Sequence, residues 1–406
     1  MILKTRSKHE ITLLIFTLSI LMWGFLQNPQ GQFSDIRGFY GMRYMDGEHH
    51  WPYTPHIPLG STVPLNPVEY PALTGLIIWG LTYVDLGFTD PILNYYYLNS
   101  LINALFFILL VFLIVRLTRP SLGFLVAASP AAIQSLNLNW DIWAILPMIL
   151  SLILFQSGKY TKSAVFLAIS IATKFFPVVI LFPVLIFFYR EKKIREFFGY
   201  FFKCLSVWIT LNAPFIFIDA EGWSYFYRFS FQRSLGEGSI FTLFGKLGIP
   251  ITFPPFSYYV LNILIFAALA VFLLKSKRNH DILTTSFLAM FAFMFFGKQY
   301  SMQYILWLLS LAVLSLRELR WQKNRLVFLT FFVWQLTEYF FHLAYFRNLF
   351  SRVMVERGVE ALMLFSDQRY GTFALIRYIS IATFVISLVI TLYNKNDLRV
   401  GAKRKE

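Results

Sequence analysis

The chain has 406 residues, of which 57% are hydrophobic and only 14% are charged. A soluble domain usually carries about 25% charged residues, so this composition excludes an ordinary soluble protein and is typical of a membrane protein. The net charge of +15 lies in short basic clusters between apolar runs, which argues against nucleic-acid binding. The single cysteine, Cys204, excludes disulfides within the chain and cysteine-based zinc fingers.

The first apolar run, residues 11–25, follows the basic residues Lys4, Arg6 and Lys8. A signal peptide would end in a small-x-small cleavage site, which the next residues lack. We therefore expect an uncleaved first helix. Because basic residues favour the cytoplasmic side, the N-terminus is predicted to be cytoplasmic.

Later apolar runs predict an all-α polytopic protein that forms a single integral membrane domain over residues 1–406. With the first helix they give about twelve spans, and placing the basic clusters inside puts both termini in the cytoplasm. The predicted helices are 97–116, 120–136, 142–156, 163–174, 175–189, 198–218, 255–274, 281–296, 304–316, 326–345 and 373–394.

Residues 71–84 are apolar but short, and crossing the membrane here would invert every later basic cluster. They are interpreted as re-entrant or interfacial, within a large first external loop at 27–96. Residues 219–254 are predicted to form a second external loop. Pro177 separates the short runs 163–174 and 175–189, which are candidates for broken helices around a cavity.

Asp35 follows the first predicted helix almost directly, which anchors it at the membrane surface. A carboxylate there can act as a general base that takes a proton from an attacking hydroxyl. The alternative is that Ser34 and Asp35 cap a short helix starting near Ile36. From the spacing alone, capping is the stronger interpretation.

The same loop carries Asp46, Glu48, His49, His50 and His56. Carboxylates with imidazoles suit a divalent metal. Glycine and proline nearby indicate a loop without fixed geometry, so the sequence favours a solvated loop over a metal site.

Two further polar segments are predicted on the external side. Glu69, just before Pro71, either contacts a polar substrate or faces water. Asn139, Trp140 and Asp141 lie in a turn, where Asp141 either caps the next helix or joins a sugar-binding turn with Trp140 stacked on a pyranose.

Two external lysines break the positive-inside pattern. Lys174 lies at a helix end among aromatic residues, a costly place for a charge unless it is paired or functional. Lys298 lies between two apolar runs on the same predicted side. Snorkelling to the interface is the alternative to binding an anion such as a lipid-linked phosphate. Arg228 and Arg233 in the second external loop would add to the same positive field.

The order of these segments resembles glycosyltransferase family 87, membrane enzymes of the GT-C superfamily that include polyprenol-phosphate-mannose-dependent mannosyltransferases. The similarity covers about residues 30–310, and it departs from the family where Met302 replaces an expected proline. The matching segments are Ser34-Asp35, Val68-Glu69-Tyr70-Pro71-Ala72-Leu73-Thr74-Gly75, Asn139-Trp140-Asp141, Ala172-Thr173-Lys174-Phe175-Phe176-Pro177 and Tyr300-Ser301-Met302-Gln303-Tyr304-Ile305-Leu306-Trp307.

The resemblance implies a GT-C-type bundle and inverting transfer of a sugar, most simply mannose, from a polyprenyl-phosphate donor, without metal or cofactor. It implies that Asp35 is the base. The acceptor is expected to be a glycolipid or polysaccharide, and the active site to lie on the external or periplasmic face of the plasma membrane. Donor phosphate binding is predicted for Lys174, Lys298, Arg233 and Tyr304, and acceptor or sugar binding for Arg37, Glu69, Tyr70, Asn139, Trp140, Asp141 and Gln303.

The alternative function is a polytopic lipid or glycan transporter or flippase, which would share the hydropathy. Such a protein is expected to show inverted repeats or charges near the membrane midplane. A large acidic and aromatic first loop favours the glycosyltransferase.

Overall fold

In the computed structural model, the regular secondary structure of the described residues is helical, apart from an isolated antiparallel bridge between His56 and Leu65. This confirms the all-α prediction. The predicted first helix at 11–25 lies mostly outside the described residues, which are 13–14, 16–18, 20–21, 34–57, 60–236, 238–251, 253–254, 256–276, 281–356 and 365–403.

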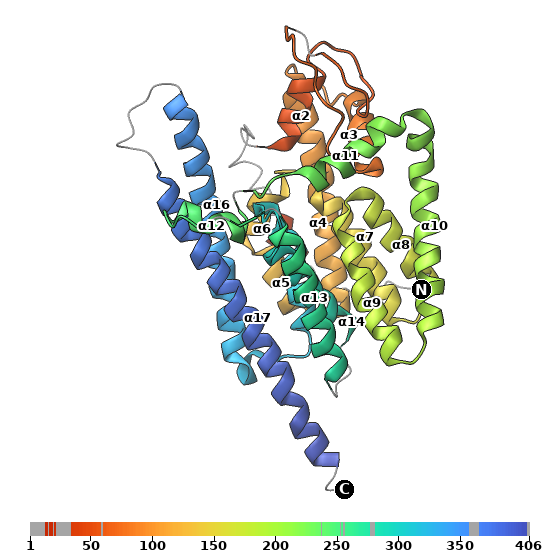
Figure 1. The fold of residues 1–406 in the computed structure, drawn as a ribbon, viewed down its shortest axis with the longest axis vertical. Helices are drawn as coiled ribbons and strands as arrows, with labels where there is room; N and C mark the ends of the chain where they lie inside the picture. Colours follow the sequence, from red (N-terminus) through yellow and green to blue (C-terminus); the bar gives the residue numbers. More distant parts are fainter. Residues whose placement is uncertain are drawn as a thin grey trace. The chain divides into compact units, whose positions relative to one another are not determined.

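Contacts divide the chain into two compact units. Unit 1 comprises residues 1–128, 132–233 and 306–314, and unit 2 comprises 129–131, 234–305 and 315–406. In unit 1, α2, α3 and α11 lie at one end of α4, α7, α8 and α10, and the basic turn after α9 lies at the opposite end (Figure 1). The helices of unit 1 are α2 (Asp35–Arg43), α3 (Ala72–Gly80), α4 (Pro91–Leu117), α5 (Pro120–Ala127), most of α6 (Pro130–Leu136), α7 (Asp141–Gln156), α8 (Tyr160–Thr173), α9 (Leu181–Arg190), α10 (Ile194–Ile218), α11 (Ala220–Gln232) and most of α15 (Ile305–Ser315), with 3-10 turns η1 (Leu81–Tyr83) and η2 (Phe176–Ile180).

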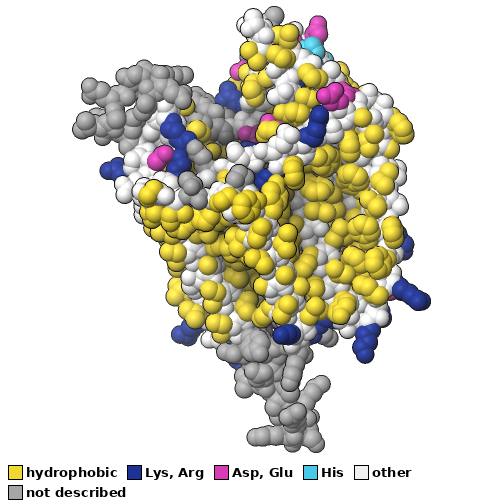
Figure 2. Space-filling view, in the orientation of Figure 1, with side chains coloured by type: hydrophobic (Ala, Val, Ile, Leu, Met, Phe, Trp, Pro, Cys, Tyr) yellow, Lys and Arg dark blue, Asp and Glu magenta, His cyan; other side chains and the backbone are white. Residues whose placement is uncertain are grey.

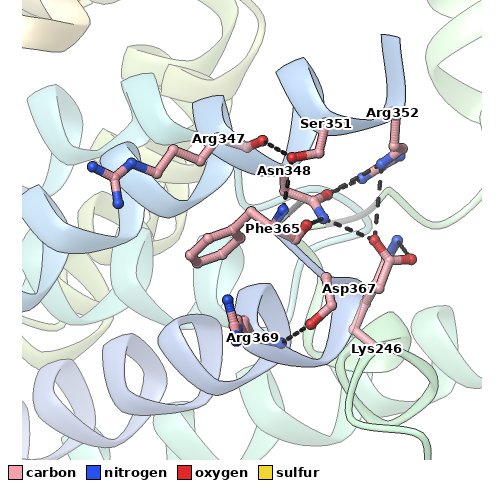
Figure 3. A network of polar contacts seen from close by, with 9 residues as sticks. Lys246, Arg347, Asn348, Ser351, Arg352, Phe365, Asp367 and Arg369 are labelled. Atoms are coloured by element: carbon pink, nitrogen blue, oxygen red, sulfur yellow. Dashed lines mark hydrogen bonds and ion pairs between the residues drawn. The ribbon is translucent and has the colours of Figure 1, made fainter. Parts of the chain in front are cut away.

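Unit 2 is organised around two long helices, α16 and α17, that pack against each other. At one end of these two helices, Asp367 Oδ2 accepts from Lys246 Nζ at 2.7 Å and Asp367 Oδ1 accepts from Asn348 Nδ2 at 2.9 Å. These contacts connect α12, α16 and α17 (Figure 3). The elements are α12 (Ile240–Lys246), α13 (Ser257–Lys275), α14 (Ile282–Phe295), η3 (Met302–Tyr304), η4 (Trp321–Lys323), α16 (Arg325–Glu356) and α17 (Asp367–Lys403).

Side-chain caps determine where several helices begin. The Asp90 carboxylate accepts from the backbone N–H groups of Ile92 and Leu93, and Pro91 occupies the first helical position, which lacks an intrahelical partner in any case. Asp281 caps α14 in the same way. The helix α4 therefore begins at Pro91, earlier than the hydropathy alone predicts.

The predicted count of about twelve spans is too high for the described residues. Five helices, α4, α10, α13, α16 and α17, are long and apolar enough to cross a membrane, and a sixth span results if α6 and α7, bent by 117°, count as one. The remaining predicted spans are helices of 8 to 16 residues. At 1.5 Å per residue they fall short of a hydrocarbon core of about 30 Å.

Two of the long helices expose apolar side chains in the way that lipid-facing helices do. On α10, Phe217 is 88% exposed, and on α13, Ile263 is 69% exposed. Figure 2 shows broad apolar surfaces on the viewed face. The structure thus supports a multi-pass helical membrane protein.

The two predicted external loops contain helices. Residues 71–84 form α3 and η1, and a nine-residue helix is only about 14 Å long, too short to span a bilayer alone. Residues 219–254, predicted as a loop, contain α11 and α12.

Candidate functional site

Four segments distant in the sequence meet at the end of unit 1 that carries α2 and α3. The Ser34 hydroxyl accepts from Ile36 N–H, which confirms Ser34 as a cap while Asp35 is the first residue of α2. The same hydroxyl donates to the Asn137 carbonyl at 2.6 Å. The Asp35 N–H donates to the Leu138 carbonyl at 2.9 Å. The start of α2 is therefore fixed to the turn that precedes α7.

The start of α3 is fixed in a similar way. Thr74 Oγ1 donates to the carbonyl of Thr173, the last residue of α8, at 2.6 Å. The Tyr53 hydroxyl donates to the Pro71 carbonyl at 2.8 Å and passes so close to Gly75 that a Cβ there would lie 2.0 Å from the Tyr53 Oη. These contacts hold Tyr70, just before α3, in place.

These contacts fix the position of the Asp35 carboxylate. Its side chain is exposed, and its Oδ2 accepts a hydrogen bond from the Tyr70 hydroxyl at 3.3 Å. The surrounding protein raises the pKa of Asp35 by desolvation, while the Lys174 cation and the Tyr70 hydroxyl oppose that rise. The carboxylate is thus reachable by a ligand but poorly hydrated, which is the setting of many catalytic bases.

Lys174 forms an ion pair, which offsets the free-energy cost of placing its charge among apolar residues. Its Nζ lies 2.6 Å from Asp141 Oδ1, and its side chain is 14% exposed whereas that of Asp141 is fully buried. Asp141 Oδ2 also accepts from Trp307 Nε1 at 3.0 Å. Asp141 begins α7 and Lys174 directly follows the last residue of α8, so each charge lies at the helix end whose dipole stabilises it.

The ion pair is joined to Asp35 through Tyr70. Lys174 Nζ lies 4.8 Å from the centre of the Tyr70 ring, a cation–π distance, and the same tyrosine donates to Asp35. Burial, with the nearby Asp35 and Asp141 charges, raises the pKa of Tyr70 well above its ordinary value, so the phenol stays protonated and remains a donor.

A second group of charges surrounds Glu69, which is exposed. Desolvation raises the pKa of Glu69, and Arg233 and Arg43 oppose the rise while Asp35 adds to it. Arg233 thus acts on both Glu69 and Asp35, whereas Arg43 acts on Glu69. Arg43 was not predicted, although it lies eight residues after Asp35 on α2, a spacing that returns to the same helix face.

Two predicted roles in the 139–141 turn are not supported by the geometry. Trp140 is 2% exposed, donates to Asn99 Oδ1 at 2.7 Å, and packs edge-on against Tyr70 at 5.1 Å. Its ring has no free face for a sugar, so it is a packing residue. The Asp141 side chain does not cap α7 but binds Lys174 instead. Asn139 is also 2% exposed, and its Oδ1 accepts from the Asp141 N–H at 3.1 Å.

Arg37 lies on the opposite side of α2 from Asp35. Two residues along a helix rotate a side chain by roughly 200°, and Arg37 lies near enough to Tyr96 of α4 to interact with it electrostatically. Arg37 is therefore separate from the Asp35 cluster.

Lys298, Gln303 and Tyr304 belong to unit 2. Lys298 Nζ donates to the Tyr259 hydroxyl at 2.7 Å and lies 5.4 Å from the Tyr258 ring. Gln303 and Tyr304 lie in the short turn η3, where Gln303 is half-buried and Tyr304 is buried. Their predicted roles in binding donor and acceptor stay predictions.

The residues that the sequence did not reveal are Glu338 and Arg377 in unit 2. Arg377 Nε lies 2.9 Å from Glu338 Oε2, and both side chains are fully buried between α16 and α17. Arg377 also donates to the Tyr300 carbonyl at 2.8 Å, and the Tyr300 hydroxyl donates to Glu338 at 3.2 Å. The pair therefore holds the turn between Lys298 and η3.

Comparisons of the chain with models of known protein families, with curated proteins and with solved structures find no match.

Proposed function

We propose that this protein is a membrane glycosyltransferase that moves a sugar, most simply mannose, from a polyprenyl-phosphate donor to an acceptor hydroxyl, with inversion. The observation that carries the proposal is the Asp35 carboxylate, which is exposed, has a raised pKa and accepts from Tyr70. Its place beside Lys174 and Arg233, on a unit with exposed apolar helices, suits a lipid-borne anionic substrate. The sequence resemblance to glycosyltransferase family 87, and hence to a GT-C-type bundle, supports the same proposal.

In the proposed reaction, Asp35 takes the proton of the acceptor hydroxyl as its oxygen attacks the anomeric carbon. The bond between that carbon and the phosphate oxygen breaks from the opposite face, and polyprenyl phosphate leaves. Lys174 and Arg233 stabilise the charge that builds on the phosphate. Asp141, which is buried behind Lys174, positions the ammonium group, and Glu69 and Tyr70 border the acceptor side.

The proposed location is the plasma membrane, with both termini in the cytoplasm and the Asp35 cluster outside. The basic turn after α9 and the start of α2 lie at opposite ends of unit 1 (Figure 1), which agrees with the positive-inside rule for this arrangement.

The substrate class is tested with purified protein and a panel of polyprenyl-phosphate sugars that includes mannose and arabinose. We expect release of polyprenyl phosphate from one donor, accelerated by a glycolipid or polysaccharide acceptor. Release from none of the donors, with protein that is folded by thermal unfolding, would count against the proposal.

The pH dependence follows from the raised pKa of Asp35. A base works only when deprotonated, so kcat/KM should rise with pH through that raised pKa and then level off. The rising limb should therefore lie at higher pH than an ordinary aspartate would give. A pH–rate profile that is flat from pH 4 to pH 8, or that falls as the pH rises through the acidic range, would contradict the role of Asp35.

A second candidate function is lipid or glycan transport, because Glu338 and Arg377 form a buried charge pair near the middle of two candidate spans. Intramembrane charges are typical of transport pathways. Translocation of a labelled polyprenyl-phosphate sugar across proteoliposomes, without its hydrolysis or transfer, would favour this function.

A further inference from the structure

The loop between α2 and α3 gathers one carboxylate and two imidazoles. The potential ligand atoms of Asp46, His50 and His56 all lie within 4.8 Å of one another. His50 Nε2 lies 2.8 Å from Asp46 Oδ2, and the His50 and His56 rings stack with centroids 4.4 Å apart. Residues four and ten positions apart thus converge on one point.

Each of the three residues is held by a backbone restraint of its own. Asp46 Oδ1 accepts from the Glu48 N–H at 3.0 Å, which leaves Oδ2 directed at His50. The His50 carbonyl accepts from the buried Tyr44 hydroxyl at 3.1 Å. The His56 carbonyl accepts from Leu65 N–H at 2.8 Å in the antiparallel bridge.

The ring nitrogens of His56 lack a hydrogen bond of normal geometry, although the Arg43 backbone interacts with the ring electrostatically. Both of its ring nitrogens are shielded from solvent and have no hydrogen-bond partner among the described residues. Buried polar atoms normally find a partner, so an orphaned imidazole beside a carboxylate and a second imidazole needs an explanation. A metal ion supplies one.

We propose that Asp46, His50 and His56 bind a divalent transition-metal ion, with Zn²⁺ as the best match. Two nitrogens and one carboxylate oxygen with an open fourth position form a common zinc ligand set. Ligand atoms around tetrahedral zinc lie roughly 3.3 Å apart, so side-chain movements of about 1–2 Å complete the site. Glu48 Oε2, 3.7 Å from His50 Nε2, is close enough to supply a fourth ligand.

The ion stabilises the loop and does not take part in sugar transfer. Asp35 is the first residue of α2 and Asp46 lies beyond its last residue, Arg43, so a helix about 14 Å long lies between the two carboxylates. The loop from residue 44 to residue 71 has no helix among its described residues, so an ion that links Asp46 to His50 and His56 adds folding free energy. This inference is independent of the proposed activity.

The test uses the full-length protein, purified with a tag that lacks histidine, stripped with a chelator and titrated with Zn²⁺. We expect one bound equivalent and a higher Tm at saturation, because a ligand that binds only the folded state stabilises it. The double variant His50→Ala/His56→Ala should weaken Zn²⁺ binding by at least about 100-fold. Substitution of residues that only hydrogen-bond to metal ligands already lowers metal affinity by about 10–100-fold, and these two residues are the ligands themselves.

His49→Ala is the matched control. His49 is adjacent in sequence, but its Nδ1 is hydrogen-bonded to Thr82 Oγ1 at 2.7 Å and its ring stacks on Tyr83, so zinc affinity should not change. Absence of stoichiometric zinc in the wild type, or an equal loss of affinity in His49→Ala, would overturn the proposal. If the double variant does not fold, X-ray absorption of the zinc-loaded wild type decides, because two imidazole ligands per zinc are expected and none would refute the site.

Discussion

Replacing Asp35 by Asn is expected to lower turnover by about 10²–10⁴-fold, because the acceptor hydroxyl then lacks a base. The side chain keeps its size and can still accept from Tyr70. Since desolvation raises the pKa of Asp35, the ionised carboxylate costs folding free energy at neutral pH. This cost disappears as the pH falls through the raised pKa and the carboxyl group takes up a proton. Asparagine carries no charge, so the free energy of unfolding of Asp35→Asn should not be lower than that of the wild type.

Asp85→Asn is the matched control for this experiment. Asp85 is an exposed aspartate of the same predicted external loop, and its Oδ1 accepts only a local hydrogen bond from Gly87 N–H at 2.8 Å among the contacts described. Initial rates with the active donor and thermal unfolding are measured for both variants. Near-normal turnover in Asp35→Asn would remove the assigned base, and loss of turnover together with loss of folding would assign Asp35 a structural role.

Replacing Arg377 by Met is expected to lower the free energy of unfolding by about 3–5 kcal/mol, because it leaves the fully buried Glu338 carboxylate without its cation. It also removes the donor to the Tyr300 carbonyl. Adding Glu338→Gln should recover much of this loss, since no buried charge then remains. Denaturant or thermal unfolding in detergent measures both.

The contacts of Asp367 with Lys246 and Asn348 (Figure 3) provide an exposed ion pair for comparison with the buried one. The Asp367 side chain is 53% exposed, so Asp367→Asn should cost no more than about 1 kcal/mol although it removes the negative charge that pairs with Lys246. Equal destabilisation by Arg377→Met and Asp367→Asn would show that the Glu338–Arg377 pair does not carry the stability assigned to it.

The sequence predicted those features that depend on local chemistry. The Ser34 cap, the approximate helix positions and the short apolar segment at 71–84 follow from residue preferences and hydropathy over a few turns. The number of spans was wrong because short apolar runs that are helical need not be long enough to cross a bilayer. Hydropathy reports apolar length and cannot show whether a break such as the one between α5 and α6, inside the predicted helix 120–136, divides it.

Contacts between side chains that are distant in the sequence were harder to predict. The expectation that Lys174 is paired or functional was correct, but its partner Asp141 lies 33 positions away and meets it only because α7 and α8 pack side by side. Glu338 and Arg377 are two charges in long apolar helices, and their position alone was an available signal. The burial of Trp140 depends on Tyr70 and Asn99, which the sequence does not bring together.

The central claim is that Asp35 activates an acceptor hydroxyl that displaces polyprenyl phosphate from a sugar in one step. The most direct test is the anomeric configuration of the product, determined by NMR after wild-type turnover of the active donor. The account predicts a configuration inverted relative to the donor. A retained configuration would contradict it, because retention requires two successive displacements through a covalent glycosyl-enzyme intermediate and not a single attack by the acceptor hydroxyl.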